Sequence, residues 1–116
     1  MRLSIQMVCN TFCCQEIDEI RQYINQTLCE QDQLMTDYFP LTEQLLLREG
    51  KPCGIFFCLH GPRSLQLTAV WDVLGGHVLF YGSRGERFRI TRLTGTAIKR
   101  GLPFESHMAN CATNNL

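Results

Sequence analysis

Residues 53–88 constrain the fold more than any other part of the chain. They hold three apolar runs with the composition of β-strands, separated by turn signals, and they contain the only tryptophan. Every second residue between positions 65 and 73 is apolar, and this period of two places the apolar side chains on one face of a strand. The Gly-Gly pair at residues 75–76 then supplies the positive φ angles that a tight hairpin turn requires. The pattern predicts antiparallel strands joined by short turns, a β-meander.

Two further strand patterns adjoin this one. Residues 55–59 are apolar at every position, which is typical of a strand that is covered on both faces. Residues 88–93 alternate again after a turn at residues 82–86. Trp71 lies in the middle of the strand that alternates best, so we expect a buried indole beneath the helix described next.

A different period marks the chain before this stretch. Apolar residues recur at intervals of three and four positions from residue 17 onward, with charged and polar residues between them. This spacing predicts an amphipathic helix that runs to about Gln33 and packs its apolar stripe onto the sheet. The stripe consists of Ile17, Ile20, Ile24 and Leu28. The predicted fold class is therefore α+β, with one N-terminal amphipathic helix against an antiparallel sheet of four or five strands.

Residues 40–49 have two interpretations. Pro40 at a first helical position and Gly50 beyond the end would bracket a second short helix. The turn signal at residues 50–52 instead allows residues 44–48 to pair with residues 53–59. We favour this hairpin.

The two ends of the chain carry weaker signals. Leu3, Ile5 and Met7 alternate, which allows a short additional strand within residues 1–14, and residues 94–100 would extend the last strand. We expect one α+β domain over residues 1–100. The polar, asparagine-rich residues 101–116 are expected to form a mobile C-terminal tail.

The charges are distributed unevenly along the chain. The formal net charge is zero, and 45% of the residues are hydrophobic, as in an ordinary globular domain. Residues 1–50 nevertheless contain eight acids and three bases, whereas residues 51–116 contain eight bases and three acids. We expect the two halves to face each other and partly neutralise.

Seven cysteines are present, without the spacing of a disulfide framework. The first residues lack the clean apolar run of a signal peptide, and no segment approaches the ~18–20 apolar residues of a membrane span. We therefore expect a cytoplasmic protein that keeps its thiols reduced and makes no contact with a membrane.

Four segments, TLCEQDQL, CGIFFCLHGPRS, TAVWD and FYGSRGERF, resemble a group of short uncharacterised bacterial proteins. The resemblance covers roughly residues 22–92 and implies a bacterial origin. It implies no activity, so no site residue is carried over from it.

Cysteine chemistry provides one alternative function. Cys53, Cys58 and His60 are close in sequence, but the two cysteines would point to opposite faces of a strand, so we predict neither a metal site nor a cofactor. Cys58 and His60 lie two positions apart and would share a face, with their β-carbons ~6–7 Å apart. A small cysteine-dependent enzyme using this pair is the alternative, although an apolar neighbourhood raises the pKa of a thiol.

Nucleic-acid binding is a second alternative. The basic C-terminal half interleaves arginine with aromatic residues, a composition found in surfaces that bind nucleic acids. The phenylalanines fall at positions that face the core, however, and the acidic half weakens the positive field. Nucleic acid is therefore not the favoured partner.

The meander topology predicts the favoured site. Alternate turns of a meander lie at the same end of the sheet, so the turn at residues 60–63 and the turn at residues 83–87 should lie one strand apart, at ~10 Å. The residues gathered there are His60, Arg63, Tyr81, Arg84 and Arg87, with Glu86 as the only acid.

Arginine suits bidentate capture of a carboxylate or a phosphate. We therefore expect a non-catalytic binding or regulatory module that binds an anionic ligand or an acidic protein segment at one end of the sheet. The alternative is that these arginines pair with Glu86, Asp72 or the acidic helix and only solvate the rim. A homodimer through an exposed sheet edge is a further expectation.

Overall fold

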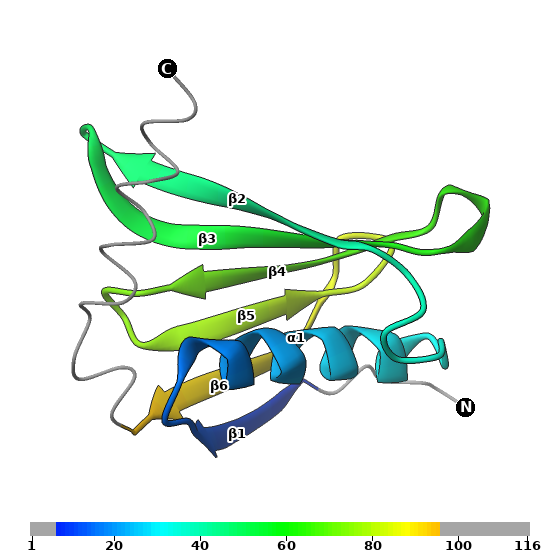
Figure 1. Ribbon diagram of the computed structural model, residues 1–116, viewed down its shortest axis with the longest axis horizontal. Helices are drawn as coiled ribbons and strands as arrows, with labels where there is room; N and C mark the ends of the chain where they lie inside the picture. The colour runs from blue at the N-terminus through cyan, green and yellow to red at the C-terminus, as the bar shows by residue number, and fades with distance from the viewer. Residues whose placement is uncertain (1–6, 96–116) are drawn as a thin grey trace.

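The computed structural model describes residues 7–95 of the 116-residue chain. The order of its elements is a strand, a helix and five more strands (Figure 1). They are β1 (Val8–Cys13), α1 (Ile17–Gln31), β2 (Leu41–Arg48), β3 (Lys51–His60), β4 (Gln66–Asp72), β5 (His77–Tyr81) and β6 (Arg87–Thr94). One turn of 3-10 helix, η1 (Pro62–Ser64), lies between β3 and β4.

All the strands join in one sheet, in the order β1-β6-β5-β4-β3-β2. Strands β2 to β6 are antiparallel neighbours, which confirms the meander, whereas β1 pairs with β6 in parallel. The α+β class is confirmed. Within residues 7–95 the sheet has six strands rather than the expected four or five, and it is mixed rather than purely antiparallel. Residues 40–49 form the favoured hairpin strand, and β2 replaces the second short helix.

We expected an additional strand within residues 1–14 because Leu3, Ile5 and Met7 alternate. Strand β1 begins just after these residues, at Val8. Most of those residues belong to residues 1–6, which lie outside the described part of the chain. Residues 96–116 also lie outside it, together with the predicted tail and the predicted extension of the last strand. The pattern did not locate β1 because the residue at its centre that faces α1, Asn10, is polar.

Asn10 takes part in a closed ring of three hydrogen bonds that joins β1, α1 and β6. Its Nδ2 donates to Oη of Tyr23 at 2.8 Å, and Oγ1 of Thr91 donates to its Oδ1 at 2.7 Å. Oη of Tyr23 lies 2.9 Å from Oγ1 of Thr91, and the tyrosine is the donor because the threonine proton is already used. The ring satisfies the polar groups of Asn10 and Thr91, so a polar strand position is tolerated beneath the helix.

Arg89 adds a fourth contact to this ring, because its Nη1 lies 3.4 Å from Oη of Tyr23. Burial alone would raise the pKa of the Tyr23 phenol. The hydrogen bonds that Asn10 and Arg89 donate to the phenol oxygen, together with its contact with Thr91 and the arginine charge, outweigh that effect and lower the pKa.

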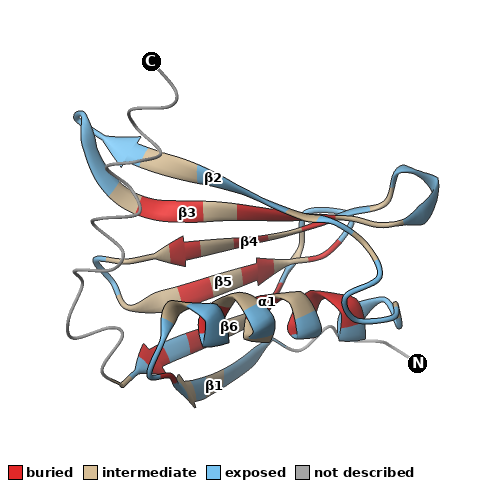
Figure 2. Ribbon diagram, viewed as in Figure 1, coloured by how far each residue is buried: buried red, intermediate tan, exposed pale blue. Residues whose placement is uncertain are grey.

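Helix α1 covers one face of the sheet (Figures 1 and 2). Three residues of the predicted stripe, Ile20, Ile24 and Leu28, are fully buried, and Ile17 packs at the edge of the same core. The strands supply the opposing layer from alternate positions, among them Ile55, Phe57, Leu59, Leu67, Ala69, Trp71, Val78 and Phe80. The core therefore lies between one helix and one side of the sheet.

Trp71 is 3% exposed, which confirms the expected buried indole. We expect Trp71→Ala to lower the free energy of unfolding by about 3–5 kcal/mol, because it leaves a large cavity beneath α1. Leu74→Ala, at a side chain that is 75% exposed, is the control and should have little effect. Fluorescence provides a second measurement, because a native emission maximum typical of indole in water would contradict the placement.

Thr91 is fully buried, and its hydroxyl holds two sides of the hydrogen-bonded ring. We expect Thr91→Val to lower the free energy of unfolding by about 1–3 kcal/mol, since it removes the acceptor of the Tyr23 hydroxyl and the donor to Oδ1 of Asn10, both in a partly buried site. Thr94→Val removes an exposed hydroxyl from the same strand and should change stability by less than about 0.5 kcal/mol. Equal losses in the two variants, measured by urea denaturation, would show that the ring contributes nothing.

Candidate binding surface

The face of the sheet opposite α1 has no element over it within residues 7–95 (Figure 1). The apolar run at residues 55–59 predicted cover on both sides. In the structure Ile55 and Phe57 face α1 and are buried, whereas Phe56 faces the other way and is half-buried. We call this uncovered side the open face.

Side chains on the open face form rows that cross the strands, because directly paired residues share a face. One row consists of Phe56, Val70, Leu79 and Ile90, each directly opposite the next on strands β3 to β6. All four are half-buried. Outward positions of a sheet covered on one side are normally polar, so this row departs from the usual pattern. We call it the apolar row.

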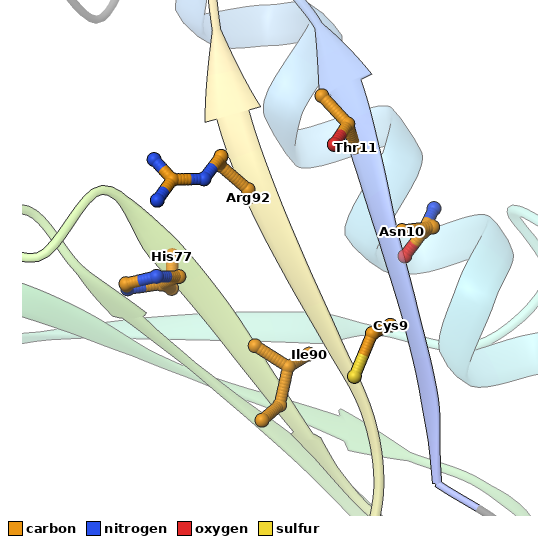
Figure 3. Close-up of a pocket in the computed structure, with 6 residues that line it drawn as sticks. All are labelled: Cys9, Asn10, Thr11, His77, Ile90 and Arg92. Atoms are coloured by element: carbon orange, nitrogen blue, oxygen red, sulfur yellow. The ribbon is translucent and has the colours of Figure 1, made fainter.

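A polar row lies next to the apolar row, toward the β4–β5 turn. Asp72 pairs with His77, which pairs with Arg92. Oδ1 of Asp72 accepts the backbone N–H of Gly75 at 3.1 Å, so this carboxylate is engaged in shaping the turn. In Figure 3, where α1 passes behind the sheet, the guanidinium of Arg92 extends over β5 toward His77.

Two cavities border these rows. The first, of about 310 Å³, is lined by Cys9, Asn10, Thr11, His77, Ile90 and Arg92 (Figure 3). The second, of about 500 Å³, includes Val70, Asp72 and Leu79 in its wall, together with residues of β2, β3 and the β4–β5 turn. The cavities adjoin, because Asp72 pairs with His77 and Leu79 pairs with Ile90.

The residues of the predicted anion site lie toward the other end of the strands. The β3–β4 and β5–β6 turns are at the same end, since β3 to β6 are successive antiparallel neighbours. His60 and Tyr81 lie on the open face, and Nε2 of His60 is 3.0 Å from Oγ1 of Thr42. Arg87 is the first residue of β6, and its guanidinium carbon lies 5.5 Å from the centroid of the Tyr81 ring. Tyr81 and Arg87 therefore form a cation–π pair.

Arg63 and Arg84 lie in the two turns and are exposed. Glu86, the acid of the second turn, accepts the backbone N–H of Arg84 at 3.1 Å. Its carboxylate makes no ion pair with a guanidinium among the described residues. The structure thus brings Tyr81 and Arg87 into contact, and the convergence of Arg63 and Arg84 on them stays a prediction.

The two sides of the molecule differ in charge. Both ion pairs within residues 7–95 involve Arg21, which lies 2.8 Å from Asp18 and 2.6 Å from Glu43 on the helix side. Arg87 and Arg92 on the open face form no ion pair with another described residue, although the sequence led us to expect the acidic half to neutralise the basic half. Asp72 is the single acid at the outward positions of strands β1 to β6, and a second described acid, Glu86, lies in the β5–β6 turn.

The Cys58–His60 pair has the geometry expected of neighbours on one face of a strand, but its electrostatics do not favour a nucleophile. Cys58 is 8% exposed, and burial raises the pKa of its thiol. A catalytic thiolate requires a lowered pKa. In the described part of the chain, no three side chains of His, Cys, Asp or Glu gather closely enough to hold a metal ion.

Sequence reasoning missed the apolar row, His77 and Arg92. The available signal was Val70, the one apolar residue on the polar side of its strand. Pairing β4 with β5 about the Gly-Gly turn places Val70 opposite Leu79, and the same step along the next turn reaches Ile90.

No protein-family model matches the chain, and neither the curated proteins nor the solved structures compared with it include a match. The resemblance to short bacterial proteins therefore stays a prediction. Within residues 7–95, no helix has the length and apolar character that a membrane span requires.

The thiols differ in exposure, and this difference predicts their reactivity. Cys9 and Cys13 are exposed, whereas Cys14, Cys29 and Cys58 are buried. Burial is the largest cause of the raised pKa values of all three buried thiols, and the pKa of Cys14 reaches about 11. At neutral pH we expect iodoacetamide to modify Cys9 and Cys13 first, and the buried thiols only on unfolding. Peptide mass mapping checks this order, and fastest reaction at Cys58 would instead support the cysteine enzyme.

Proposed function

We propose that the protein is a non-catalytic binding module whose open face binds a carboxylate-rich ligand, such as an acidic segment of another protein. The observation that carries the proposal is the unneutralised positive charge of this face. Within residues 7–95, Arg87 and Arg92 have no ion-pair partner, and Oδ1 of Asp72, the acid in the same row as Arg92, accepts a hydrogen bond from its own turn. Arginine side chains that are not paired with an acid of their own protein can form ion pairs with the acidic groups of a ligand.

The setting of Arg87 suits this role. Stacking on Tyr81 restricts the guanidinium while its N–H groups remain at the edge of the plane, where a carboxylate can accept two of them. His60 shares this face, and Arg63 and Arg84 extend from the adjacent turns at the same end. We propose that the five residues form one rim of the binding surface.

Nucleic acid remains the second candidate because the aromatic ring of Tyr81 lies beside Arg87 and Phe56 adds a second ring to the same face. The aliphatic residues between and beyond these rings, Val70, Leu79 and Ile90, provide no stacking surface. A protein ligand therefore fits the face better.

The thiols and the edges of the sheet bear on where the protein works and how it assembles. The six cysteines that the structure describes are free thiols, which supports a reducing, cytoplasmic environment. Strands β1 and β2 are the edges of the sheet, so a homodimer through a sheet edge would use one of them.

We expect poly-L-glutamate to bind the protein and to bind less well as salt is raised, because exposed charges are screened. Arg87→Ala should weaken binding by about two- to fivefold, the effect of one exposed ion pair, and should leave thermal stability unchanged. NMR titration of the labelled protein measures both the affinity and the residues affected.

Arg21→Ala is the matched control, because Arg21 is paired with Asp18 and Glu43 on the opposite side. This variant should lose up to about 1 kcal/mol of stability and keep its affinity. The proposal is overturned if poly-L-glutamate does not bind at low salt, or if the two substitutions weaken binding equally.

A further inference from the structure

An anion site requires positively charged groups, and it does not require the continuous apolar surface that the apolar row provides. Phe56, Val70, Leu79 and Ile90 lie directly side by side across β3 to β6, so they form one continuous stripe rather than scattered apolar positions. With a strand spacing of ~4.8 Å, the stripe is ~14 Å long. A contiguous apolar patch framed by polar residues is typical of a protein-binding surface.

Arginines lie on both sides of this stripe. On β6, Arg92 lies two residues after Ile90 and on the same face. Arg87 lies three residues before Ile90, but the register shift between Phe80 and Tyr81 places it on that face too, opposite Tyr81. Their partners on β5, Tyr81 and His77, are four residues apart, so at ~3.3 Å per residue the two arginines are ~13 Å apart, with the apolar row between them. The surface is therefore an apolar stripe that crosses the strands, flanked on each side by a cation.

An α-helix matches these dimensions. Its diameter with side chains is about 10–12 Å, so a helix laid along the stripe would fit between the two arginines, and about nine residues would span the stripe. An extended segment is narrower, and it binds a sheet by adding to an edge rather than by crossing a face. The two cavities border the stripe, one at Ile90 and the other at Val70 and Leu79, and provide recesses for large apolar side chains.

We propose that the open face binds an amphipathic α-helix of a partner protein, whose apolar side covers the apolar row and whose acidic residues flank that side. This inference rests on the proposed function and names its partner. The described part of a second copy does not supply the helix, because the apolar stripe of α1 is already buried against its own sheet. The acids of the partner helix would reach Arg92 on one side and Arg87 on the other.

The test compares two peptides of identical composition, made of leucine, alanine and glutamate. In the first, the leucines recur at i, i+3, i+4 and i+7 and form one stripe; in the second, the order is scrambled, so the charge is equal but no stripe exists. We expect the amphipathic peptide to bind about tenfold more tightly than the scrambled one, with a Kd below about 1 mM. NMR shifts should map to the outward positions of β3 to β6.

The double variant Val70→Thr/Leu79→Thr keeps strand-compatible side chains, because threonine favours strands and its hydroxyl can face water here. It should reduce the preference for the amphipathic peptide to less than about twofold and leave binding of poly-L-glutamate unchanged. Met35→Thr, at an apolar side chain that is 68% exposed between α1 and β2, is the control and should keep the preference.

The outcomes separate the two proposals. If both peptides bind equally and Arg87→Ala weakens both, the acidic ligand stands and the helix is overturned. If the amphipathic peptide binds about tenfold more tightly than the scrambled one, and the double variant removes this preference, the helix is supported. If neither peptide binds and poly-L-glutamate also fails, the proposed function itself is wrong. Displacement of the amphipathic peptide by oligo-dT at equal concentration would overturn the inference in favour of a nucleic-acid surface.

Discussion

The fold depends on one constraint, which is that a single helix must cover the apolar side of a six-stranded sheet. Helix α1 has 15 residues, and the centres of the outer strands of a flat sheet of this size would be ~24 Å apart. A helix about 10 Å wide shields only part of such a surface. Leu34 and Phe39, in the connection between α1 and β2, pack against the same core and extend the cover toward β2. With its one helix used on this side, the described chain has no element left for the other, so the outward residues of the strands determine what that side can do.

The attachment of β1 uses a different kind of interaction from the rest of the sheet. The inward positions of the central strands β3 to β5 are apolar, whereas Asn10 and Thr91 form a closed ring of hydrogen bonds with Tyr23. Hydrophobic burial is non-directional, but hydrogen bonds require particular atoms at particular distances. A slip of one residue along β6 would turn Asn10 to the opposite face and leave Tyr23 and Thr91 unsatisfied. The ring therefore specifies the register of a strand that has little apolar pattern of its own.

Local patterns predicted the elements whose inward residues are apolar. The stripe of α1, the meander and the burial of Trp71 follow from periods of 3.6 and 2, and the Gly-Gly turn fixed the pairing of β4 with β5. The bounds of β1 and its parallel pairing with β6 were not predicted, because the centre of β1 is a hydrogen-bonded asparagine and the pairing joins residues about 80 positions apart. The site was predicted only at the level of topology. The sequence indicated that the two turns lie at the same end of the sheet. The apolar run at residues 55–59, however, predicted a strand covered on both faces, so the exposed apolar row that begins at Phe56 was not predicted.

The parallel pairing of β1 with β6 also has a mechanical consequence. The described chain enters the sheet through the first of these strands and leaves it through the second, and both run in the same direction side by side. Tension between the two ends would therefore slide the strands past each other, so that the hydrogen bonds of all six paired positions carry the load together. A hairpin pulled from its open end loses its bonds one after another. Strand β1, which has the weakest hydrophobic pattern in the sheet, thus forms with β6 the pairing that would resist a stretching force most strongly.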